Sequence, residues 1–314
     1  MIYVDLQGYG AGNQLFQYAA ARAVQEIMPG QGICVNLADI RKYQCELVLD
    51  HFCTNVSIEE HMQSSVRLYG TIGQKALARF FRLRRKLARS RTELYELDRR
   101  YASVLQNAGI YQLAHSYAPL RRAKTQNVFL SGNFECWQIC QKIRPILLRE
   151  IRPANPPSKK NSLMMERMKQ QNSVLLHVRR GDFLKTHRDI CTDVYYQKAV
   201  EYIRTHISNP VFYVFSNDVK WVKNKMDLGD NVVYEDSFDR CDVAELLTIM
   251  SSCRHFVIAN STLSWWAQFL GDYEQKVVVA PQYGNKSWSK LGYPSTSIMP
   301  EWVTIDVTTG EVAN

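Results

Sequence analysis

Apolar and polar positions in the second half of the chain alternate in blocks of strand and helix length. Short continuous apolar runs predict strands at 174–178, 210–216, 232–234, 255–259 and 276–280. Segments of helical composition predict helices at 162–170, 194–203, 220–225, 242–252 and 265–270. A continuous hydrophobic run is typical of a strand buried on both faces. This alternation therefore predicts an α/β fold, with helices on both faces of a parallel sheet.

The first half shows the same kinds of block less regularly. Strands are predicted at 2–6, 33–37 and 128–134, helices at 15–25 and 137–151, a short strand or loop at 47–52, and a helical, basic region over 64–105. A glycine-containing loop separates the first strand from the first helix, and its candidate residues are Gly10, Gly12, Asn13 and Gln14. Such a loop aims backbone N–H groups and a helix N-terminus at a polar or anionic ligand. The glycine spacing differs from GxGxxG, so this loop alone does not indicate a dinucleotide site.

A proline-containing segment divides the chain. Residues 153–162 include three prolines, which break both regular structures. A length of 314 residues fits two domains of ordinary size. We therefore predict domains at 1–154 and 155–314.

Composition is that of an ordinary globular protein, with 46% hydrophobic and 22% charged residues. No apolar run approaches the length of a transmembrane helix, and the N-terminus lacks the pattern of a signal peptide. The eight cysteines form no CxxC pair, which favours reduced thiols over a zinc site. These features together predict a cytoplasmic protein.

The net charge of +9 is concentrated in one segment. Residues 67–149 hold 17 Lys and Arg against 4 Asp and Glu, and the densest part is 79–91. Its apolar residues can share one side of a helix, and they are Leu77, Phe80, Phe81, Leu83, Leu87 and Ala88. Basic amphipathic helices bind anionic membranes or nucleic acid. The alternative is a solvated helix that packs its apolar side on its own domain.

Polar side chains follow three of the strands predicted in the second half. The stretch 174–183 is a strand expected to bring His177, Arg179, Arg180 and Asp182 to the edge of a cleft. Arginine suits phosphate because its planar fork donates two parallel hydrogen bonds. A surface loop with an incidental Arg-Arg-Gly-Asp is the alternative interpretation.

The next two strands end in Ser216-Asn217-Asp218 and Asn260-Ser261-Thr262. The carboxyl ends of parallel strands meet at one edge of a sheet, so the three groups predict a nucleotide-diphosphate site. Asn260, Ser261 and Ser264 are equally suited to capping a helix. The sequence has neither a P-loop lysine motif nor a DxD motif, so arginines and backbone dipoles are expected to neutralise the phosphates without a metal.

Four segments resemble the motifs of bacterial α-1,2-fucosyltransferases of glycosyltransferase family 11. They are the glycine loop 10–18, the HxRRGD-like stretch 177–183, the stretch 215–221 and the signature 250–266. The second motif is shared more loosely with α-1,6- and protein O-fucosyltransferases. The resemblance implies a GT-B fold of two facing Rossmann-like domains. It also implies inverting, metal-free transfer of L-fucose from GDP-fucose to the 2-hydroxyl of a terminal galactose, with no other cofactor.

The resemblance also implies roles for individual residues. Arg179 would hold the β-phosphate and stabilise the departing GDP, as electrostatic catalysis requires. The residues expected to bind the donor are His177, Arg180, Asn217, Asp218, Asp242, Glu245, Asn260, Ser261, Thr262 and Ser264. His177 and an acidic residue would meet guanine. The family's usual Asp-Leu pair is Glu245-Leu246 here, so both Asp242 and Glu245 are candidates. The glycine loop would line the cleft from the first domain.

The general base must be a carboxylate or imidazole near the arginines. Asp182 is the predicted base, with His187 and Asp189 as the other candidates nearby. A bracing role for Asp182, toward Arg179 or the turn, is the alternative.

The expected acceptor is a galactose-terminated oligosaccharide, lipid-linked as in bacterial surface polysaccharide synthesis. The 79–91 helix would then contact the inner face of the membrane. Residues 55–125 carry no motif of the family and are expected to select the acceptor. Two alternatives are a fucosyltransferase of another linkage and a nucleic-acid-binding module that uses the basic segment. The second leaves the four motifs unexplained, so nucleic acid is not the expected partner.

Overall fold

A computed structural model describes residues 1–7, 10–113, 117–185, 189–235, 241–283 and 296–313. The chain divides into two units, Met1–Ile151 and Arg152–Asn314. The division precedes the prolines on which the sequence-based boundary, 154/155, was placed. Each unit has its own sheet and is described by itself.

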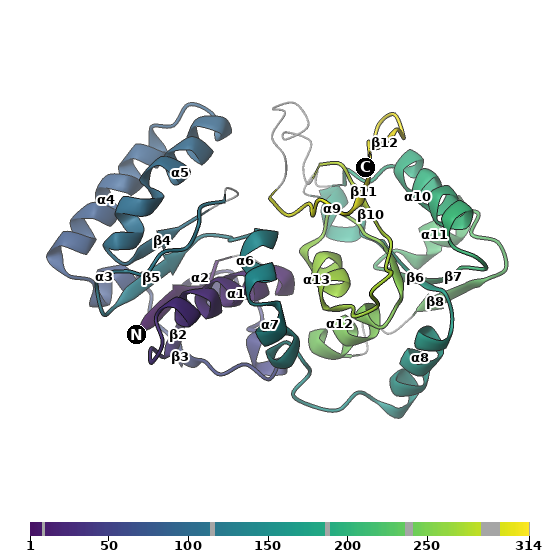
Figure 1. The fold of residues 1–314 in the computed structure, drawn as a ribbon, viewed down its shortest axis with the longest axis horizontal. Helices are drawn as coiled ribbons and strands as arrows, with labels where there is room; N and C mark the ends of the chain where they lie inside the picture. Colours follow the sequence, from purple (N-terminus) through teal and green to yellow (C-terminus); the bar gives the residue numbers. More distant parts are fainter. Residues whose placement is uncertain (8–9, 114–116, 186–188, 236–240, 284–295, 314) are drawn as a thin grey trace. The chain divides into compact units, whose positions relative to one another are not determined.

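The N-terminal unit is built on a parallel sheet (Figure 1). Its strands are β1 (Ile2–Asp5), β2 (Ile33–Asn36), β3 (Ser57–Glu59), β4 (Ile110–Gln112) and β5 (Val128–Ser131), in the order β3-β2-β1-β5-β4. β1 lies at the centre, because it pairs with both β2 and β5. The order reverses between β1 and β5, so the loops that follow these two strands flank a switch point.

The helices of this unit are α1 (Ala11–Ile27), α2 (Ala38–Lys42), α3 (Ser65–Tyr69), α4 (Ile72–Lys86), α5 (Arg91–Asn107), α6 (Trp137–Lys142) and α7 (Arg144–Glu150), with a 3-10 turn at Leu49–His51. α4 and α5 lie next to each other on one side of the sheet, and α1 and α6 pack together on the other (Figure 1). The single helix predicted over 137–151 is two helices. Pro145 lies in the first turn of α7, where a backbone N–H would have no partner within the helix. The helix is therefore interrupted at Ile143, which separates α6 from α7.

The C-terminal unit contains a larger sheet in the order β12-β11-β10-β9-β6-β7-β8. Its strands are β6 (Ser173–Val178), β7 (Val211–Ser216), β8 (Val232–Glu235), β9 (His255–Val257), β10 (Val278–Pro281), β11 (Val303–Ile305) and β12 (Val312–Ala313). All neighbours pair in parallel except β11 and β12. The run from β8 to β11 has the 3-2-1-4-5-6 order of nucleotide-binding sheets, with its switch point between β6 and β9.

The helices of the C-terminal unit are α8 (Lys159–Gln170), α9 (Gly181–Lys185), α10 (Asp193–His206), α11 (Val219–Lys225), α12 (Val243–Ser251) and α13 (Thr262–Leu270). α10 and α11 lie on one side of the sheet, and α12 and α13 on the other (Figure 1). Every residue of β6 is buried, as a central strand covered on both faces requires. The predicted α/β class with parallel sheets is confirmed.

Candidate functional site

A pocket opens at the carboxyl edge of the C-terminal sheet, beside its switch point. Its volume is about 330 Å³. The lining residues come from the end of β6 and the start of α10, and they are Arg179, Arg180, Asp189, Cys191, Thr192, Asp193 and Val194. Two adjacent arginines therefore line a space where an open α/β sheet binds its ligand.

Arg180 is held by residues that follow β7. Its backbone N–H donates to Asn217 Oδ1 at 2.9 Å, and its guanidinium carbon lies 3.9 Å from the centre of the Trp221 ring. Its Nε is 3.5 Å from Asp218 Oδ2. Asp218 also caps α11, because its Oδ1 accepts from the Trp221 N–H at 3.1 Å. The stretch 215–221 thus orients one of the arginines.

Gly181 is required by the close approach of this loop to Asn217. A Cβ at this position would lie 2.5 Å from Asn217 Nδ2, closer than Cβ atoms come to other heavy atoms in proteins. Any larger residue would displace the amide that fixes the Arg180 backbone. The glycine in the Arg-Arg-Gly-Asp sequence therefore has a packing reason.

Arg179 and His177 differ in their surroundings. The Arg179 guanidinium lies 5.5 Å from the centre of the Phe183 ring and is partly exposed in the pocket. His177 is fully buried within β6. Burial and the nearby Arg179 charge lower the pKa of His177 to about 3, so its imidazole stays neutral. His177 was expected at the edge of the cleft, but its position inside the strand keeps it from the pocket surface.

The end of β9 brings hydroxyl groups to the same edge. Ser261 is the N-cap residue of α13 but makes no side-chain capping bond, and Thr262 begins the helix. Both are partly exposed. Their hydroxyls and the first N–H groups of this nine-residue helix suit an anionic ligand.

The neighbours of these two residues are tied into the fold. Asn260 Oδ1 lies 3.6 Å from Cys191 Sγ, which lines the pocket. Ser264 is fully buried, and its hydroxyl donates to the carbonyls of Ala259 and Ser261 at 3.3 and 3.1 Å. Ser264 therefore closes the turn between β9 and α13.

The two acidic candidates for guanine have structural partners at the start of α12. Asp242 Oδ1 accepts from the N–H groups of Ala244 and Glu245, both at 2.9 Å, and so caps the helix. Glu245 Oε1 accepts from the Ser158 N–H at 2.8 Å and from Asn161 Nδ2 at 2.7 Å. Glu245 thereby joins α12 to the first turn of α8.

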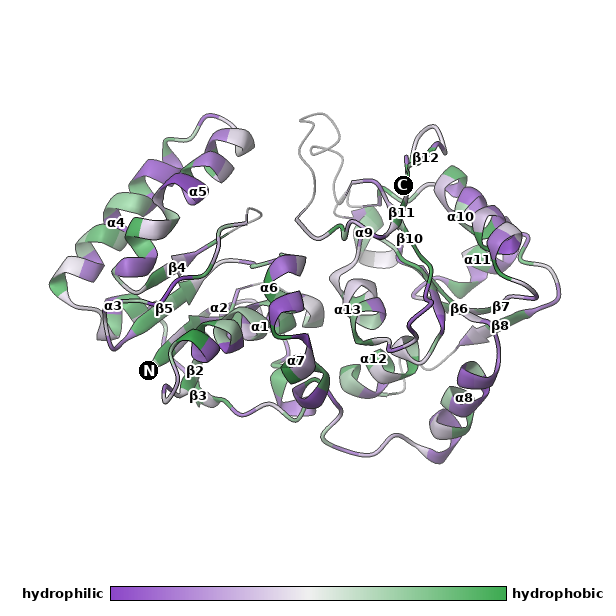
Figure 2. Ribbon diagram, viewed as in Figure 1, coloured by the Kyte–Doolittle hydropathy of each residue, from purple (hydrophilic) through white to green (hydrophobic). Residues whose placement is uncertain are grey.

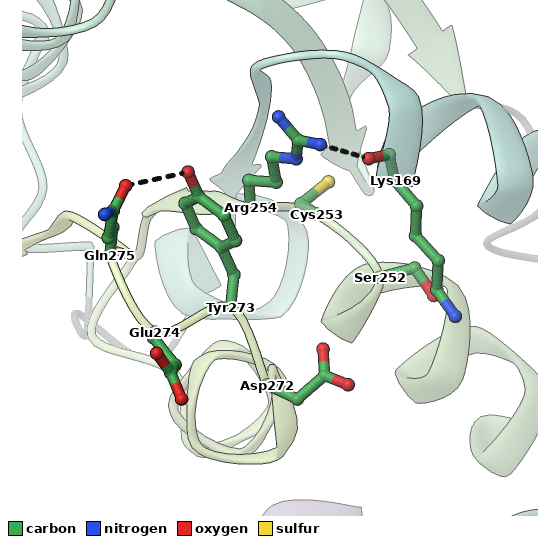
Figure 3. Close-up of a pocket in the computed structure, with 8 residues that line it drawn as sticks. All are labelled: Lys169, Ser252, Cys253, Arg254, Asp272, Tyr273, Glu274 and Gln275. Carbon is green, nitrogen blue, oxygen red and sulfur yellow. Dashed lines mark hydrogen bonds between the residues drawn. The ribbon is translucent and has the colours of Figure 1, made fainter.

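The first half of the 250–266 signature lies at the opposite, amino edge of the sheet. Arg254 donates to the Lys169 carbonyl at 2.6 Å and to Asn172 Oδ1 at 3.2 Å, and it lies over the Tyr273 ring. A second pocket, of about 500 Å³, opens around this residue (Figure 3). Arg254 clamps the end of α8 to the start of β9, so this part of the signature maintains the fold.

One of the three general-base candidates, Asp189, lines the pocket beside the two arginines. Asp182 belongs to α9, which begins directly after Arg180, but its side chain lies outside the described part of the structure. His187 also lies outside the described residues.

The glycine loop of the N-terminal unit leads directly into α1. Gly10 is the N-cap residue, and its carbonyl accepts from the Asn13 N–H at 3.1 Å. Gly12 and Gln14 are buried in the first turn. The Gln14 side chain donates to the Glu46 carbonyl at 2.7 Å and accepts from the Val48 N–H at 3.0 Å. Gln14 therefore holds the 46–48 segment.

A pocket of about 250 Å³ lies at the carboxyl edge of the N-terminal sheet and was not predicted. Its polar lining includes the last residues of four strands, Asp5, Asn36, Gln112 and Ser131, together with Gln7 and with Arg82 of α4. Asp5 Oδ1 accepts from Asn36 Nδ2 at 3.0 Å and from the Ser65 hydroxyl at 2.7 Å. Gln7 donates to Ser131 Oγ at 2.8 Å. The sequence feature that marks this pocket is a single polar residue at the end of each of these four strands.

Comparison with known families decides the class of protein. The model of glycosyl transferase family 11 matches residues 1–306. This chain belongs to glycosyltransferase family 11. The resemblance found in the four motifs is thereby confirmed.

Relatives include two proteins of Escherichia coli and one of Mus musculus. The chain is 35% identical over 141 residues to the O-antigen biosynthesis glycosyltransferase WbnK, covering 43% of this chain and 45% of the relative. It is 36% identical over 121 residues to an alpha-1,2-colitosyltransferase, covering 35% and 40%. It is 25% identical over 197 residues to the mouse galactoside alpha-(1,2)-fucosyltransferase 2, covering 59% and 56%. The chain thus spans about half the length of the curated relatives it matches.

Solved structures of the fucosyltransferase NodZ from Bradyrhizobium share the fold. One aligns with a TM-score of 0.51 at 8% identity, covering 99% of this chain and 97% of NodZ. Another, of NodZ alpha-1,6-fucosyltransferase co-crystallized with GDP, aligns with a TM-score of 0.50 at 8% identity and the same coverage. The predicted GT-B type of fold is confirmed.

The described residues include no helix both long and apolar enough to span a bilayer. They also include no group of three or more His, Cys, Asp or Glu side chains arranged to hold a metal ion.

Proposed function

We propose that the protein transfers L-fucose from GDP-fucose to the 2-hydroxyl of a terminal galactose, with inversion at the sugar carbon. The observation that carries the proposal is the pair Arg179 and Arg180 in a pocket at the switch point of a nucleotide-binding sheet. The family membership and the relative named as a galactoside alpha-(1,2)-fucosyltransferase support the reaction type.

The C-terminal unit binds the donor in this proposal. Arg179 and Arg180 hold the diphosphate oxygens, and Ser261, Thr262 and the N-terminus of α13 complete the phosphate site from the other side of the switch point. Asn217 and Asp218 act by orienting Arg180. Asp242 or Glu245 meets guanine at the start of α12.

The chemical step breaks the bond between the fucose anomeric carbon and the β-phosphate oxygen. The bonding electrons leave with GDP, whose growing negative charge Arg179 stabilises without a metal. The galactose 2-hydroxyl oxygen forms the new bond, and its proton passes to a carboxylate. Asp189 and Asp182 are the candidates for this base.

The N-terminal unit binds the acceptor in this proposal. Its 250 Å³ pocket is of the size of a sugar ring, and its carboxylate, amide and hydroxyl groups suit sugar hydroxyls. The glycine-loop residues Gly10, Gly12 and Asn13, at the start of α1, contribute to acceptor binding. We propose a galactose-terminated, lipid-linked polysaccharide precursor as acceptor. The protein would meet it at the cytoplasmic face of the membrane.

A second candidate function is transfer of colitose from its GDP-sugar. The relative named alpha-1,2-colitosyltransferase is 36% identical over the matched stretch. Fucosyl transfer with another linkage is a further alternative, because the HxRRGD-like stretch is shared across linkages. A nucleic-acid-binding role for the basic segment is less favoured, because it would leave the pocket that Arg179 and Arg180 line without a ligand.

The test is incubation of the purified protein with GDP-fucose or GDP-colitose and a series of galactosides. NMR of the product would identify the sugar, the linkage and the anomeric configuration. We expect an α-1,2-linked fucosyl galactoside, formed equally well in EDTA. A colitosyl product, another linkage or a requirement for divalent ions would each overturn the corresponding part of the proposal.

A further inference from the structure

α4 exposes a row of large apolar side chains. Ile72, Phe80, Leu83 and Leu87 are 89%, 50%, 57% and 62% exposed. At about 100° per residue these positions, with Ala76 between them, fall within an arc of about 80° on the helix. Figure 2 shows hydrophobic and hydrophilic residues interspersed along α4. We call this row the apolar stripe.

The apolar stripe is not used to attach α4 to its own unit. The opposite side of the helix does so, through Phe81, which is buried against Leu105 and Ile110, with Leu77 packed beside them. Arg85 forms an ion pair with the fully buried Asp98. A capping box at Thr71 and Gln74 fixes the first turn. Phe80 and Phe81 were predicted on one apolar side of the helix, but Phe80 is exposed and Phe81 is buried.

Basic residues border the apolar stripe. Lys75, Arg79, Arg82 and Lys86 fall within the adjoining arc of about 60° on one side, and Arg84 lies on the other. All five are exposed. The helix therefore presents an apolar band flanked by cations, which is the arrangement of helices that lie in the plane of a membrane surface.

We propose that α4 binds an anionic lipid bilayer, with the apolar stripe in the headgroup and upper acyl region and the flanking cations on lipid phosphates. Charge complementarity decides the occupant. Nucleic acid would engage the cations but leave Ile72, Leu83 and Leu87 in water. A second copy of this chain would bring two rows of like charge together across the contact.

Arg82 connects this surface with the proposed acceptor site, because it also lines the pocket of the N-terminal unit. Membrane binding by α4 would therefore hold that pocket next to the bilayer, where a lipid-linked sugar is presented. This last step rests on the proposed function, whereas the binding of lipid does not.

The experiment is flotation of the full chain with vesicles of phosphatidylcholine alone, or with about one third phosphatidylglycerol, which supplies the anionic surface. The protein is expected to float with the anionic vesicles and to remain behind with the neutral ones. Phe80→Gln with Leu83→Gln should abolish flotation at any salt concentration. Lys75→Gln, Arg79→Gln and Lys86→Gln together should weaken it roughly a hundredfold, at about fivefold per removed charge. Arg85 is left intact because of its ion pair, and Arg82 because it lines the pocket.

Matched controls come from the C-terminal unit. Leu163→Gln with Val233→Gln removes two exposed apolar residues, and Lys159→Gln, Arg167→Gln and Lys225→Gln remove three exposed charges. Both controls should float as the unaltered protein does. The proposal is overturned if the unaltered protein stays behind, if the apolar variant still floats, or if the controls lose flotation equally. If the unaltered protein does not bind vesicles but self-associates, and the α4 variants do not, the occupant is a second copy of this chain. If it binds RNA instead, and the α4 variants do not, the occupant is nucleic acid.

The readout separates this proposal from the enzymatic one. Flotation is measured without GDP-fucose or a galactoside, so a failure of the proposed reaction leaves it unaffected. On a short water-soluble galactoside, the α4 variants should keep the activity of the unaltered protein.

Discussion

Arg179 and Arg180 are adjacent in sequence but differ in how they are held. Arg180 has its backbone fixed by Asn217 and its guanidinium stacked on Trp221. Arg179 lies beside Phe183 and faces the pocket. We infer that Arg180 chiefly positions the diphosphate, whereas Arg179 is the group that can respond to charge developing on it.

Replacing Arg179 with lysine keeps the charge and removes the planar fork. If Arg179 stabilises the leaving diphosphate, kcat should fall by about 10²- to 10³-fold, as when an oxyanion donor is lost. The acceptor KM should change little. Steady-state kinetics on both substrates would measure this, with Arg254→Lys, at the far edge of the sheet, as the control. A kcat within a few-fold of the original would contradict the assignment.

His177 gives the protein a specific acid sensitivity. Its pKa is about 3 in the folded protein because of burial and the Arg179 charge, against about 6.5 when unfolded. Between these values the unfolded state binds a proton that the native state does not. The contribution of a neutral His177 to the free energy of unfolding is fully present above about pH 6.5. It decreases as the pH falls below this value, by about 2 kcal/mol at pH 5.

Urea unfolding at pH 7.5, 6.5 and 5 would measure this slope. The variant His177→Gln should lose about 2 kcal/mol of the pH dependence over that range. His255, whose pKa is lowered to about 4 by burial and Arg254, contributes a slope of the same sign, so His255→Gln is the comparison. An unchanged slope in the His177 variant would show that its imidazole is not held neutral.

At the scale of elements, apolar runs located the strands because burial on both faces leaves a continuous hydrophobic segment. The predicted strands at 174–178 and 210–216 correspond closely to β6 and β7. β3, β4, β11 and β12 were not predicted, because each is only two or three residues long and too short to show a period. β9 is also three residues long, but its apolar run continues to Ala259 and made it visible. The sequence placed His177 within the predicted strand 174–178, but it did not reveal that β6 stays buried as far as Val178, which keeps the imidazole from the pocket.

Glu245 lies in a motif of the family, but in the structure it connects two helices by hydrogen bonds. Its Oε1 accepts two hydrogen bonds from the first turn of α8. Glu245→Ala should lower the free energy of unfolding by about 1–3 kcal/mol, because two donors lose a charged acceptor. Glu245→Gln keeps one acceptor oxygen and should cost less.

The same pair of variants tests the guanine contact proposed for this residue. Chemical denaturation gives the stability, and calorimetric titration with GDP gives the affinity. If Glu245 only joins the two helices, GDP affinity should be unaltered in Glu245→Gln. A large loss of GDP binding in a variant that remains stable would instead assign Glu245 to guanine and leave Asp242 as the helix cap.

At the scale of the molecule, the two units share the same arrangement of sheet and pocket. Each has a parallel sheet whose order reverses beside its central strand, and each has a pocket at the carboxyl edge. The sequence indicated this edge in the C-terminal unit because arginines followed a long apolar strand. It did not indicate the N-terminal pocket, because Asp5, Asn36, Gln112 and Ser131 are single polar residues with no shared motif.

A division of substrates between the two pockets makes a kinetic prediction. Gln112 lines the N-terminal pocket and ends β4. Gln112→Ala should raise the acceptor KM by about 3- to 10-fold, the cost of about one hydrogen bond, and leave the donor KM unchanged. Arg82→Gln should act in the same direction, whereas Arg79→Gln, on the same helix but not lining the pocket, should not. If the donor KM rises instead, the N-terminal pocket binds the nucleotide sugar, and the proposed assignment of substrates to the two units is reversed.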